Sequence, residues 1–384
     1  MLKRKFMDMD KILLFITIVF FIFGTLNIVT ASSREAVVNN DTYLYYYFFK
    51  HISILIAGLI CFFFIINIPT KNYKYFIFML YAIVLGLNLF LILKGVSTRG
   101  AQNWINLKVM KIQPSEFAKP TLIVYLAALL ERFYKKLKNN KLPHDNMIWS
   151  IIGFGLIIPI LVFLQKDLGT ATILISIFLV LFLSSPISSQ EKIKSSIIVS
   201  VIGVIGIIMM LSINGYILSD AQKSRFDFYN PCSKYSTSGY QICNAFIAIN
   251  NGGIKGVGIG KSTQKYSYIP EPHTDMVFSI IAEENGFIIC TLILIGYIVI
   301  LYRIIKLSTK TNSIMNRYIC LGIATYIFAH IFVNLGGLIG LIPLTGVPLP
   351  FFSYGGSFTL SLIASLSIIQ RIHIETRNQK IKIK

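Results

Sequence analysis

The sequence predicts an all-α polytopic membrane protein, and two observations support this fold class. Of the 384 residues, 55% are hydrophobic and only 14% are charged, whereas soluble domains usually carry about 25% charged residues. Apolar runs also recur along the chain at or near the roughly 20 residues that cross a bilayer as a helix. No stretch between them is polar and long enough for a soluble domain, so we expect residues 1–384 to form a single integral membrane domain.

Hydropathy divides the chain into ten apolar segments, each of which we expect to be a transmembrane helix. Their approximate bounds are 11–31, 46–68, 73–93, 114–130, 147–164, 168–185, 196–217, 276–301, 317–338 and 354–370. An even number places both termini on one side of the membrane. Because Lys and Arg gather in alternate loops, the positive-inside rule assigns that side to the cytoplasm. The net charge of +20 therefore does not indicate nucleic-acid binding, since the basic residues form no soluble basic face.

Two of the predicted outer segments are unusual. Residues 218–275, before the eighth helix, form one long extracellular loop whose apolar residues indicate order. Residues 339–353, before the tenth helix, contain three prolines and several glycines, which exclude a regular helix, and their apolar content excludes a free loop. Irregular backbone near membrane depth must be buried in protein or line a cavity. We therefore expect a re-entrant segment beside a polar cavity.

Cysteines fall into two groups. Cys61, Cys290 and Cys320 lie in apolar runs and are predicted to be core residues. Cys232 and Cys243 lie in the long loop, on the side where disulfides form. The sequence leaves open whether these two are joined or free.

Polar residues gather where the eighth apolar segment begins. Residues 270–275, Pro-Glu-Pro-His-Thr-Asp, place two carboxylates and a histidine at the mouth of a predicted membrane helix. Asp275 can be a helix cap or a functional carboxylate. Ser279 and Glu283 follow at i+4 and i+8 on the same face, with Glu283 about 12 Å deeper. Together with Glu284 they suggest a polar shaft that runs inward from the outer surface.

Three other polar groups interrupt or flank apolar segments. Glu116 and Lys119 can pair at i,i+3, either to fix helix packing or to offer Lys119 to an anionic ligand. Asp167, in a very short connection, can cap the sixth helix or contact a ligand. Trp104 shares a predicted outer loop with Arg99 and can be an interfacial anchor.

Several classes of site find no support in the sequence. There is no Walker-type phosphate loop, no closely spaced Cys/His zinc set and no His-Glu-x-x-His motif. The glycines of residues 256–260 lack the strand and helix of a dinucleotide site. No nucleophile elbow is present, and His273 has no serine at a recognisable spacing.

Taken together, these motifs resemble the SEDS family, which comprises the RodA, FtsW and SpoVE proteins of bacterial shape, division and sporulation. The matching stretches follow one another along nearly the whole chain: 100–105, 113–119, 167–171, 239–241, 252–253, 258–260, 270–275, 283–284 and 343–356. Residues 344–346 are more similar to RodA and residues 264–266 to FtsW, so the subfamily stays open. Asn103, Asn285 and Phe358 depart from the residues common in relatives.

This resemblance implies a ten-helix polymerase of peptidoglycan glycan strands in the bacterial plasma membrane, with its active site facing outward. The implied substrate is lipid II, a disaccharide-pentapeptide on undecaprenyl pyrophosphate, and the implied partner is a class B penicillin-binding protein, a transpeptidase. Asp275 matches the family's essential aspartate. As a general base it could suffice alone, because a pyrophosphate whose charge is balanced leaves without protonation, unlike the leaving group of glycoside hydrolysis.

Charge on the leaving group could be balanced by Lys119, Arg99, Lys261 or a divalent cation such as Mg²⁺ or Mn²⁺. No dedicated metal cage is visible in the sequence, and no cofactor is predicted with certainty. The remaining residues assigned to substrate binding are Glu116, Trp104, Asp167, Gln264, Glu271, His273 and Ser353.

Two other classes of function stay open. Ten helices, a broken segment and intramembrane carboxylates also suit a transporter such as a lipid flippase, although no internal repeat is evident. A scaffold that only recruits the transpeptidase would leave the charges within the membrane without a use.

Overall fold

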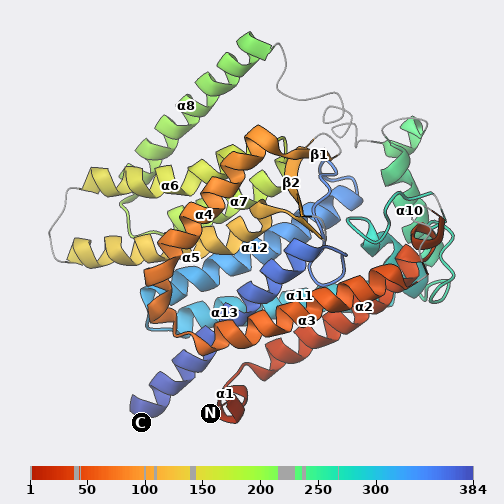
Figure 1. Ribbon diagram of the computed structural model, residues 1–384, viewed down its shortest axis with the longest axis horizontal. Helices are drawn as coiled ribbons and strands as arrows, with labels where there is room; N and C mark the ends of the chain where they lie inside the picture. The colour runs from red at the N-terminus through yellow and green to blue at the C-terminus, as the bar shows by residue number, and fades with distance from the viewer. Residues whose placement is uncertain are drawn as a thin grey trace.

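The computed structural model describes residues 2–38, 43, 45–98, 101–107, 110–138, 144–214, 230–235, 239–266 and 268–383. Long helices lie side by side along the longest axis of the molecule, and the two chain ends meet at one end of this bundle (Figure 1). The short helix α10 and the irregular connections around it lie at the opposite end. The arrangement agrees with a helical fold whose termini share one side.

The helices of the described chain are, in order, α1 (Leu2–Met7), α2 (Lys11–Val38), α3 (Tyr46–Asn67), η1 (Thr70–Asn72), α4 (Tyr73–Lys94), α5 (Pro114–Lys138), α6 (His144–Leu164), α7 (Leu168–Leu183), α8 (Ser189–Asn214), η3 (Pro231–Lys234), α10 (Tyr240–Gly252), α11 (Val277–Lys310), α12 (Ile314–Leu338) and α13 (Gly356–Ile383). Each of the ten apolar segments overlaps one of the longer helices, which confirms the helical fold class.

Seven of these helices are long and apolar enough to cross a membrane: α2, α3, η1 with α4, α6, α11, α12 and α13. The helix α7 is apolar but shorter. The helix α5 is rich in charged residues at its ends, and its middle is almost wholly buried. A multi-pass membrane protein is therefore supported, while the count of ten spans stays a prediction.

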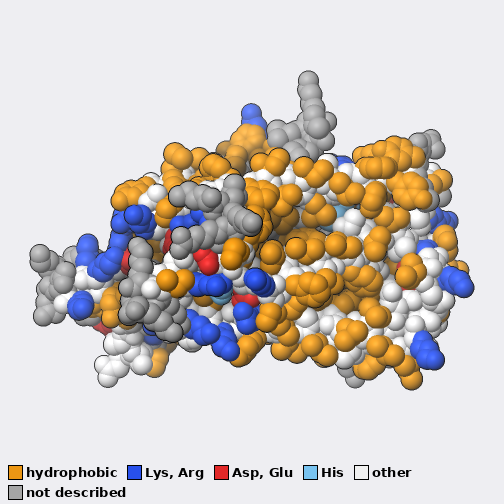
Figure 2. All heavy atoms as spheres, turned by 90° about the horizontal axis from the view of Figure 1, so that it is seen from below, with side chains coloured by type: hydrophobic (Ala, Val, Ile, Leu, Met, Phe, Trp, Pro, Cys, Tyr) orange, Lys and Arg blue, Asp and Glu red, His pale blue; other side chains and the backbone are white. Residues whose placement is uncertain are grey.

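Hydrophobic side chains also cover the outside of the bundle. Figure 2 shows a broad hydrophobic band across one face, with Lys and Arg side chains gathered on either side of it. Such a band is what a bilayer requires of a protein surface, because lipid tails solvate apolar side chains and not charges.

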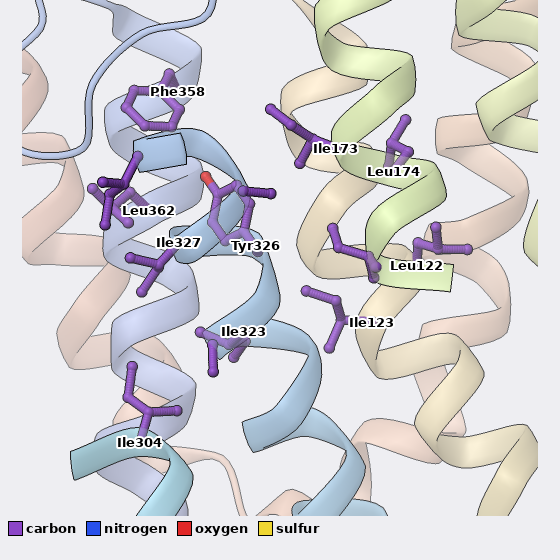
Figure 3. Close-up of a cluster of buried hydrophobic side chains, with 14 of the residues drawn as sticks. Leu122, Ile123, Ile173, Leu174, Ile304, Ile323, Tyr326, Ile327, Phe358 and Leu362 are labelled. Atoms are coloured by element: carbon purple, nitrogen blue, oxygen red, sulfur yellow. The ribbon is translucent and has the colours of Figure 1, made fainter. Parts of the chain in front are cut away.

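The protein core lies where α5, α7, α12 and α13 meet. Leu122 of α5, Leu174 of α7 and Tyr326 of α12 are buried there. The labelled residues of this cluster in Figure 3 are Leu122, Ile123, Ile173, Leu174, Ile304, Ile323, Tyr326, Ile327, Phe358 and Leu362. The most apolar windows of α12 and α13 are 67% and 78% buried, against 22–44% for the other spanning helices. These two helices therefore face protein more than lipid.

A small antiparallel sheet, β1 (Val96–Thr98), β2 (Ala101–Leu107) and β3 (Met110–Ile112), joins α4 to α5. Ile105 pairs with Ile112 and Leu107 with Met110. The sequence predicted only an outer loop over these residues. The strands are too short to show a clear alternating pattern, yet they satisfy backbone groups that would otherwise need water.

The connection between α12 and α13, residues 339–355, is irregular, and its second half is largely buried, from Val347 to Ser353. We call it the 339–355 segment. Phe351 and Phe352 pack against Phe20 of α2, and the Tyr297 hydroxyl of α11 donates a hydrogen bond to the Pro350 carbonyl at 2.5 Å. The predicted irregular backbone is confirmed, whereas the re-entrant course of the segment and its depth in a bilayer stay predictions.

The helix α11 is interrupted at Gly286, whose φ is 74°. The loop after α10 closes against this point: the amides of Phe287 and Ile288 donate to the carbonyls of Gly253 and Ile254 at 2.9 and 3.3 Å. A Cβ on Gly286 would lie 2.3 Å from the Gly256 nitrogen. The kink and the loop therefore depend on a residue without a side chain.

We predict that Gly286→Ala lowers the thermal unfolding temperature, because the new Cβ strains the backbone and pushes the loop away, at a cost on the order of 2 kcal/mol or more. Gly86→Ala is the control, since a Cβ there meets nothing within 4 Å and should change stability by less than about 1 kcal/mol. Equal melting temperatures for the two variants in the same detergent would contradict the prediction.

Candidate functional site

Asp275 lies in the turn before α11 and is 4% exposed. The N-cap position of α11 is Met276, and no side chain caps it, so Asp275 is not the helix cap that its position allowed. Its Oδ1 accepts a hydrogen bond from the Thr274 hydroxyl at 3.0 Å. Thr274 is itself held, because its amide donates to the Glu271 carbonyl at 3.0 Å. Its hydroxyl also lies 2.8 Å from that carbonyl, so its single proton is shared between this oxygen and Asp275 Oδ1. The carboxylate is therefore oriented by a local turn.

The backbone of Asp275 is held from a second side by α12. Asn334 Nδ2 donates to the Asp275 carbonyl at 2.7 Å and to the Val347 carbonyl at 2.8 Å. The 339–355 segment passes directly beside the carboxylate, since a Cβ on Gly346 would lie 3.8 Å from Asp275 Oδ2. Sequence reasoning missed Asn334. A single amide side chain in an apolar helix is costly unless it has a hydrogen-bond partner. Its position in the apolar sequence of α12 could therefore have identified Asn334 as a candidate.

His273, two residues before Asp275, packs against three other elements. Its buried ring lies 4.3 Å from the Tyr47 ring and 5.5 Å from the Tyr354 ring, centroid to centroid. Its Nδ1 is 3.3 Å from Glu35 Oε2, although the two atoms lack hydrogen-bond geometry. The His273 carbonyl accepts from the Tyr354 amide at 2.8 Å. The turn that carries Asp275 is thus attached to α2, α3 and the 339–355 segment.

The buried charge pair of α5 lies elsewhere in the core. Lys119 is fully buried, and its Nζ contacts Glu116 Oε1 at 2.7 Å and His330 Nε2 at 2.9 Å. The predicted i,i+3 pairing is confirmed. Glu116 Oε2 is buried and has no hydrogen-bond partner in the described chain. Because Lys119 is enclosed, an anionic ligand can reach it only if neighbouring side chains move.

Asp167 caps α7, as one of the two sequence interpretations held. Its Oδ1 accepts from the Thr170 amide at 3.1 Å. Its Oδ2 accepts from Asn103 Nδ2 of β2 at 2.6 Å and from Gln113 Nε2 at 3.0 Å. Asp167 therefore fastens the small sheet and the start of α5 to α7, and these contacts use both of its oxygens.

Glu283 and Glu284 bind the loop that follows α10. Glu284 Oε1 pairs with Lys265 Nζ at 3.0 Å. Glu283 accepts hydrogen bonds from Asn251 Nδ2 (3.2 Å), the Ser262 hydroxyl, the Thr263 amide (3.3 Å) and hydroxyl (3.0 Å), and the Gln264 amide (3.3 Å). The Ser279 hydroxyl donates to the carbonyl of Met276 in its own turn. These contacts describe a loop anchor, in place of the polar shaft that the spacing suggested.

The remaining predicted residues are more scattered. Ser353 Oγ accepts from the Leu349 amide at 2.7 Å within the 339–355 segment. Glu271 is half-buried, Lys261 is exposed on the loop after α10, and Trp104 is half-buried on β2. Arg99 lies outside the described residues.

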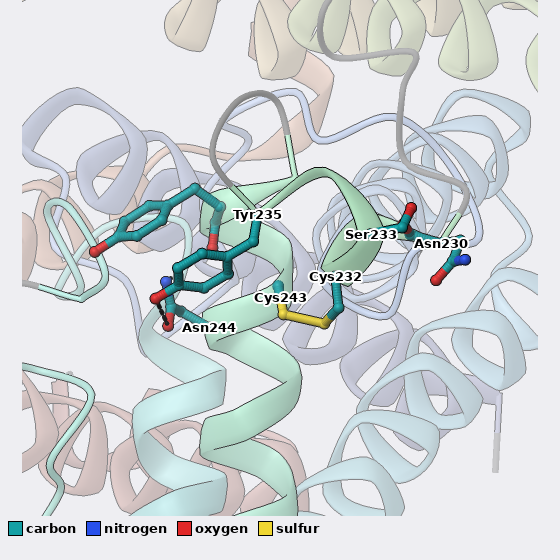
Figure 4. The surroundings of a disulfide bond; sticks show 7 residues. Asn230, Cys232, Ser233, Tyr235, Cys243 and Asn244 are labelled. Carbon is teal, nitrogen blue, oxygen red and sulfur yellow. Dashed lines mark hydrogen bonds between the residues drawn. A yellow bond between two sulfur atoms is a disulfide. The ribbon is translucent and has the colours of Figure 1, made fainter.

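A disulfide joins Cys232 of η3 to Cys243 of α10, with the two Cα atoms 4.9 Å apart (Figure 4). The Tyr235 hydroxyl donates to Asn244 Oδ1 on the same helix at 3.4 Å. Of the alternatives that the sequence left open, the structure has the joined pair, which ties η3 to α10 within the long loop. Cys290 and Cys320 are buried, as predicted, and Cys61 is half-buried.

The described residues contain no group of three His, Cys, Asp or Glu side chains that could hold a metal ion. A cation beside Asp275 would therefore take most of its ligands from the substrate or from water.

We predict that Glu283→Ala accelerates tryptic cleavage at the exposed Lys261. The change removes the charged acceptor of the loop, and hydrogen bonds to charged groups contribute on the order of 1.5–3 kcal/mol each. The control is Glu131→Ala, which removes an exposed i,i+4 pair with Lys135 of about 0.3–0.5 kcal/mol. If both variants are cleaved there at the wild-type rate, Glu283 does not anchor the loop.

Comparison with known sequences places the chain in a family. The sequence model of the family FTSW_RODA_SPOVE, described as "Cell cycle protein", matches residues 10–378. Among curated relatives, "Probable peptidoglycan glycosyltransferase FtsW" of Bacillus subtilis (strain 168) is 31% identical over 97% of this chain and 92% of its own length. "Stage V sporulation protein E" of the same organism is 31% identical, covering 92% of this chain and 94% of that protein.

Solved structures have the same fold. A chain from a peptidoglycan synthase complex superposes with a TM-score of 0.72 at 23% identity, covering 96% of this chain and 98% of that chain. The rod shape determining protein RodA of Thermus thermophilus superposes with a TM-score of 0.66 at 23% identity, covering 95% and 96%. The motifs, the helical fold and the match over residues 10–378 agree, and the chain belongs to the FtsW/RodA/SpoVE family of cell cycle proteins.

Proposed function

We propose that this chain is a peptidoglycan glycosyltransferase, which extends glycan strands by transferring the growing lipid-linked strand onto lipid II. Relatives that are 31–33% identical over nearly the whole chain carry the name peptidoglycan glycosyltransferase. The observation that carries the residue assignment is the setting of Asp275. It is a buried carboxylate whose backbone is clamped by Asn334 and whose side chain accepts a hydrogen bond from a neutral hydroxyl.

In the proposed reaction Asp275 is the general base. It accepts the proton of the 4-hydroxyl of lipid II while that oxygen attacks the anomeric carbon of the growing strand. The bond from that carbon to the pyrophosphate oxygen breaks, and undecaprenyl pyrophosphate leaves with the bonding electrons. The anomeric centre is inverted in this single displacement, so one carboxylate is sufficient.

Orientation of the base is the task of the surrounding residues. Thr274 donates to Asp275 Oδ1, which leaves Oδ2 as the oxygen that takes the proton. A base fixed before the substrate arrives loses little freedom in the transition state. The side chains proposed to contact the substrate lie in the same turn, on the loop after α10, in the 339–355 segment and on β2; they are Glu271, His273, Gln264, Ser353 and Trp104.

Charge on the leaving pyrophosphate must be balanced by cationic groups. Lys261 is exposed on the loop that Glu283 and Glu284 anchor, and we assign it the first contact with pyrophosphate. Lys119 is enclosed and paired, so its charge acts from within the core. No step is assigned to a divalent cation.

We further propose that the reaction takes place at the outer face of the plasma membrane, together with a class B penicillin-binding protein. The charge pattern of the loops supports this orientation. A similar fold comes from a peptidoglycan synthase complex that coordinates polymerization and crosslinking. The whole chain is proposed to act as one membrane domain.

We predict that Asp275→Asn and Asp275→Ala reduce strand formation by at least about 100-fold, the usual contribution of a general base. The assay uses purified protein, fluorescent lipid II and a gel that resolves glycan strands. Glu131→Gln serves as the control, because it changes a carboxylate in the C-terminal part of α5, which is not part of the turn that carries Asp275. Wild-type rates in both Asp275 variants would exclude the assignment.

The same assay separates the rival functions. Strand formation by the purified wild-type chain requires an enzyme. Movement of lipid II across proteoliposome membranes without strand formation would instead indicate a flippase. If the chain shows neither strand formation nor lipid II movement but stimulates an added transpeptidase, it is a scaffold.

A further inference from the structure

A buried histidine of α12 connects two parts of the molecule that the proposed reaction depends on. His330 is fully buried. Its Nε2 lies 2.9 Å from Lys119 Nζ of α5, and its Nδ1 lies 3.0 Å from the Pro348 carbonyl oxygen of the 339–355 segment. The imidazole is therefore the bridge between the buried charge pair and the segment beside Asp275.

The chemistry of the two partners determines the tautomer of His330. Lys119 is paired with Glu116 at 2.7 Å, and an ammonium nitrogen can only donate hydrogen bonds, so Nε2 must accept. A carbonyl oxygen can only accept, so Nδ1 must carry the proton. His330 is thus a neutral imidazole that accepts at one nitrogen and donates at the other.

Aromatic neighbours hold the ring in this orientation. The His330 ring is stacked on Phe358 of α13, with centroids 4.6 Å apart and planes at 25°. Tyr326, one turn earlier on α12, meets it edge-on at 5.0 Å and 88°. Tyr326 and Phe358 lie in the core between α12 and α13 (Figure 3). A ring fixed in this way transmits a shift of one partner to the other.

Spacing on α12 links His330 to Asp275. His330 and Asn334 are about one turn apart, four residues or about 6 Å along the helix. They hold consecutive carbonyls, since His330 binds that of Pro348 and Asn334 binds that of Val347. Asn334 also binds the Asp275 carbonyl. One face of α12 therefore sets both the path of the 339–355 segment and the position of the turn that carries Asp275.

We propose that His330 is a positioning residue, which uses its neutral, donor-and-acceptor imidazole to join the Glu116–Lys119 pair to the 339–355 segment and so to place Asp275. His330 does not touch the substrate and acts through Pro348, Val347 and Asn334. The proposal rests on the proposed function for its effect on catalysis, but the link itself exists independently of the reaction.

Two variants of His330 separate the contribution of its two hydrogen bonds from the contribution of its ring. His330→Phe keeps the aromatic stack and removes both bonds. His330→Gln loses the ring, but its amide oxygen can accept from Lys119 while its amide nitrogen donates to Pro348. Phe328→Leu, on the exposed side of the same helix, is the control for changes in α12.

We expect His330→Phe to lower kcat for strand formation on the order of 10- to 100-fold, because a misplaced base loses its near-attack geometry, while KM changes less than about threefold. His330→Gln should restore kcat to within about fivefold of wild type. Hydrogen exchange at the amides of residues 345–353 should be faster in His330→Phe and close to wild type in His330→Gln and Phe328→Leu.

Two results would overturn the proposal. The first is wild-type kcat together with wild-type exchange in His330→Phe. The second is a folded His330→Gln protein that is as impaired as His330→Phe in both measurements, since an amide that donates and accepts like the imidazole would then not restore the position of Asp275. If the wild-type chain makes no strands at all, the proposed function fails, whereas the exchange data still test the link. Should His330→Phe not fold, His330→Leu replaces it in both measurements.

Discussion

The amide of Asn334 is the interaction on which the candidate site depends. One nitrogen binds the carbonyl oxygens of Asp275 and Val347 at 2.7 and 2.8 Å, and so joins α12, the start of α11 and the 339–355 segment. Irregular backbone inside an apolar protein must find its hydrogen-bond partners within the protein. The amide of Asn334 donates one N–H to each of two such carbonyls, and these two hydrogen bonds fix the position of Asp275.

Three other buried carboxylates differ from Asp275 in what surrounds them. Glu284 is paired with Lys265, Glu116 with Lys119, and Glu283 accepts several donors of one loop. An ionised carboxylate in a low-dielectric interior is costly unless charges or donors balance it, and these three are balanced by the protein itself. The side chain of Asp275 instead accepts a hydrogen bond from the neutral hydroxyl of Thr274. This difference in surroundings is the physical reason to assign proton transfer to Asp275 and structural roles to the others.

Prediction from sequence succeeded where a property is local. Each of the ten apolar segments that hydropathy located overlaps a long helix, and proline and glycine content identified the irregular residues 339–353. The i,i+3 spacing paired Glu116 with Lys119, and the connection before α7 indicated the Asp167 cap. The sheet of residues 96–112 was missed, because strands of three to seven residues show little periodicity. The polar shaft was inferred from one helix face alone, and α10 with its loop covers that face.

The sequence by itself determined that the chain is a helical membrane protein of a known family and that residue 275 is a carboxylate at the mouth of a helix. Composition, period and motif order carry that information because each depends on neighbours along the chain. Only the tertiary structure decided that Asn334 and His330 hold successive carbonyls, that Lys119 is enclosed, and that Glu283 and Glu284 anchor a loop. These contacts join residues that lie far apart along the chain, 19 positions for Lys265 and Glu284 and 211 for Lys119 and His330. Packing of the helices, not local propensity, brings them together.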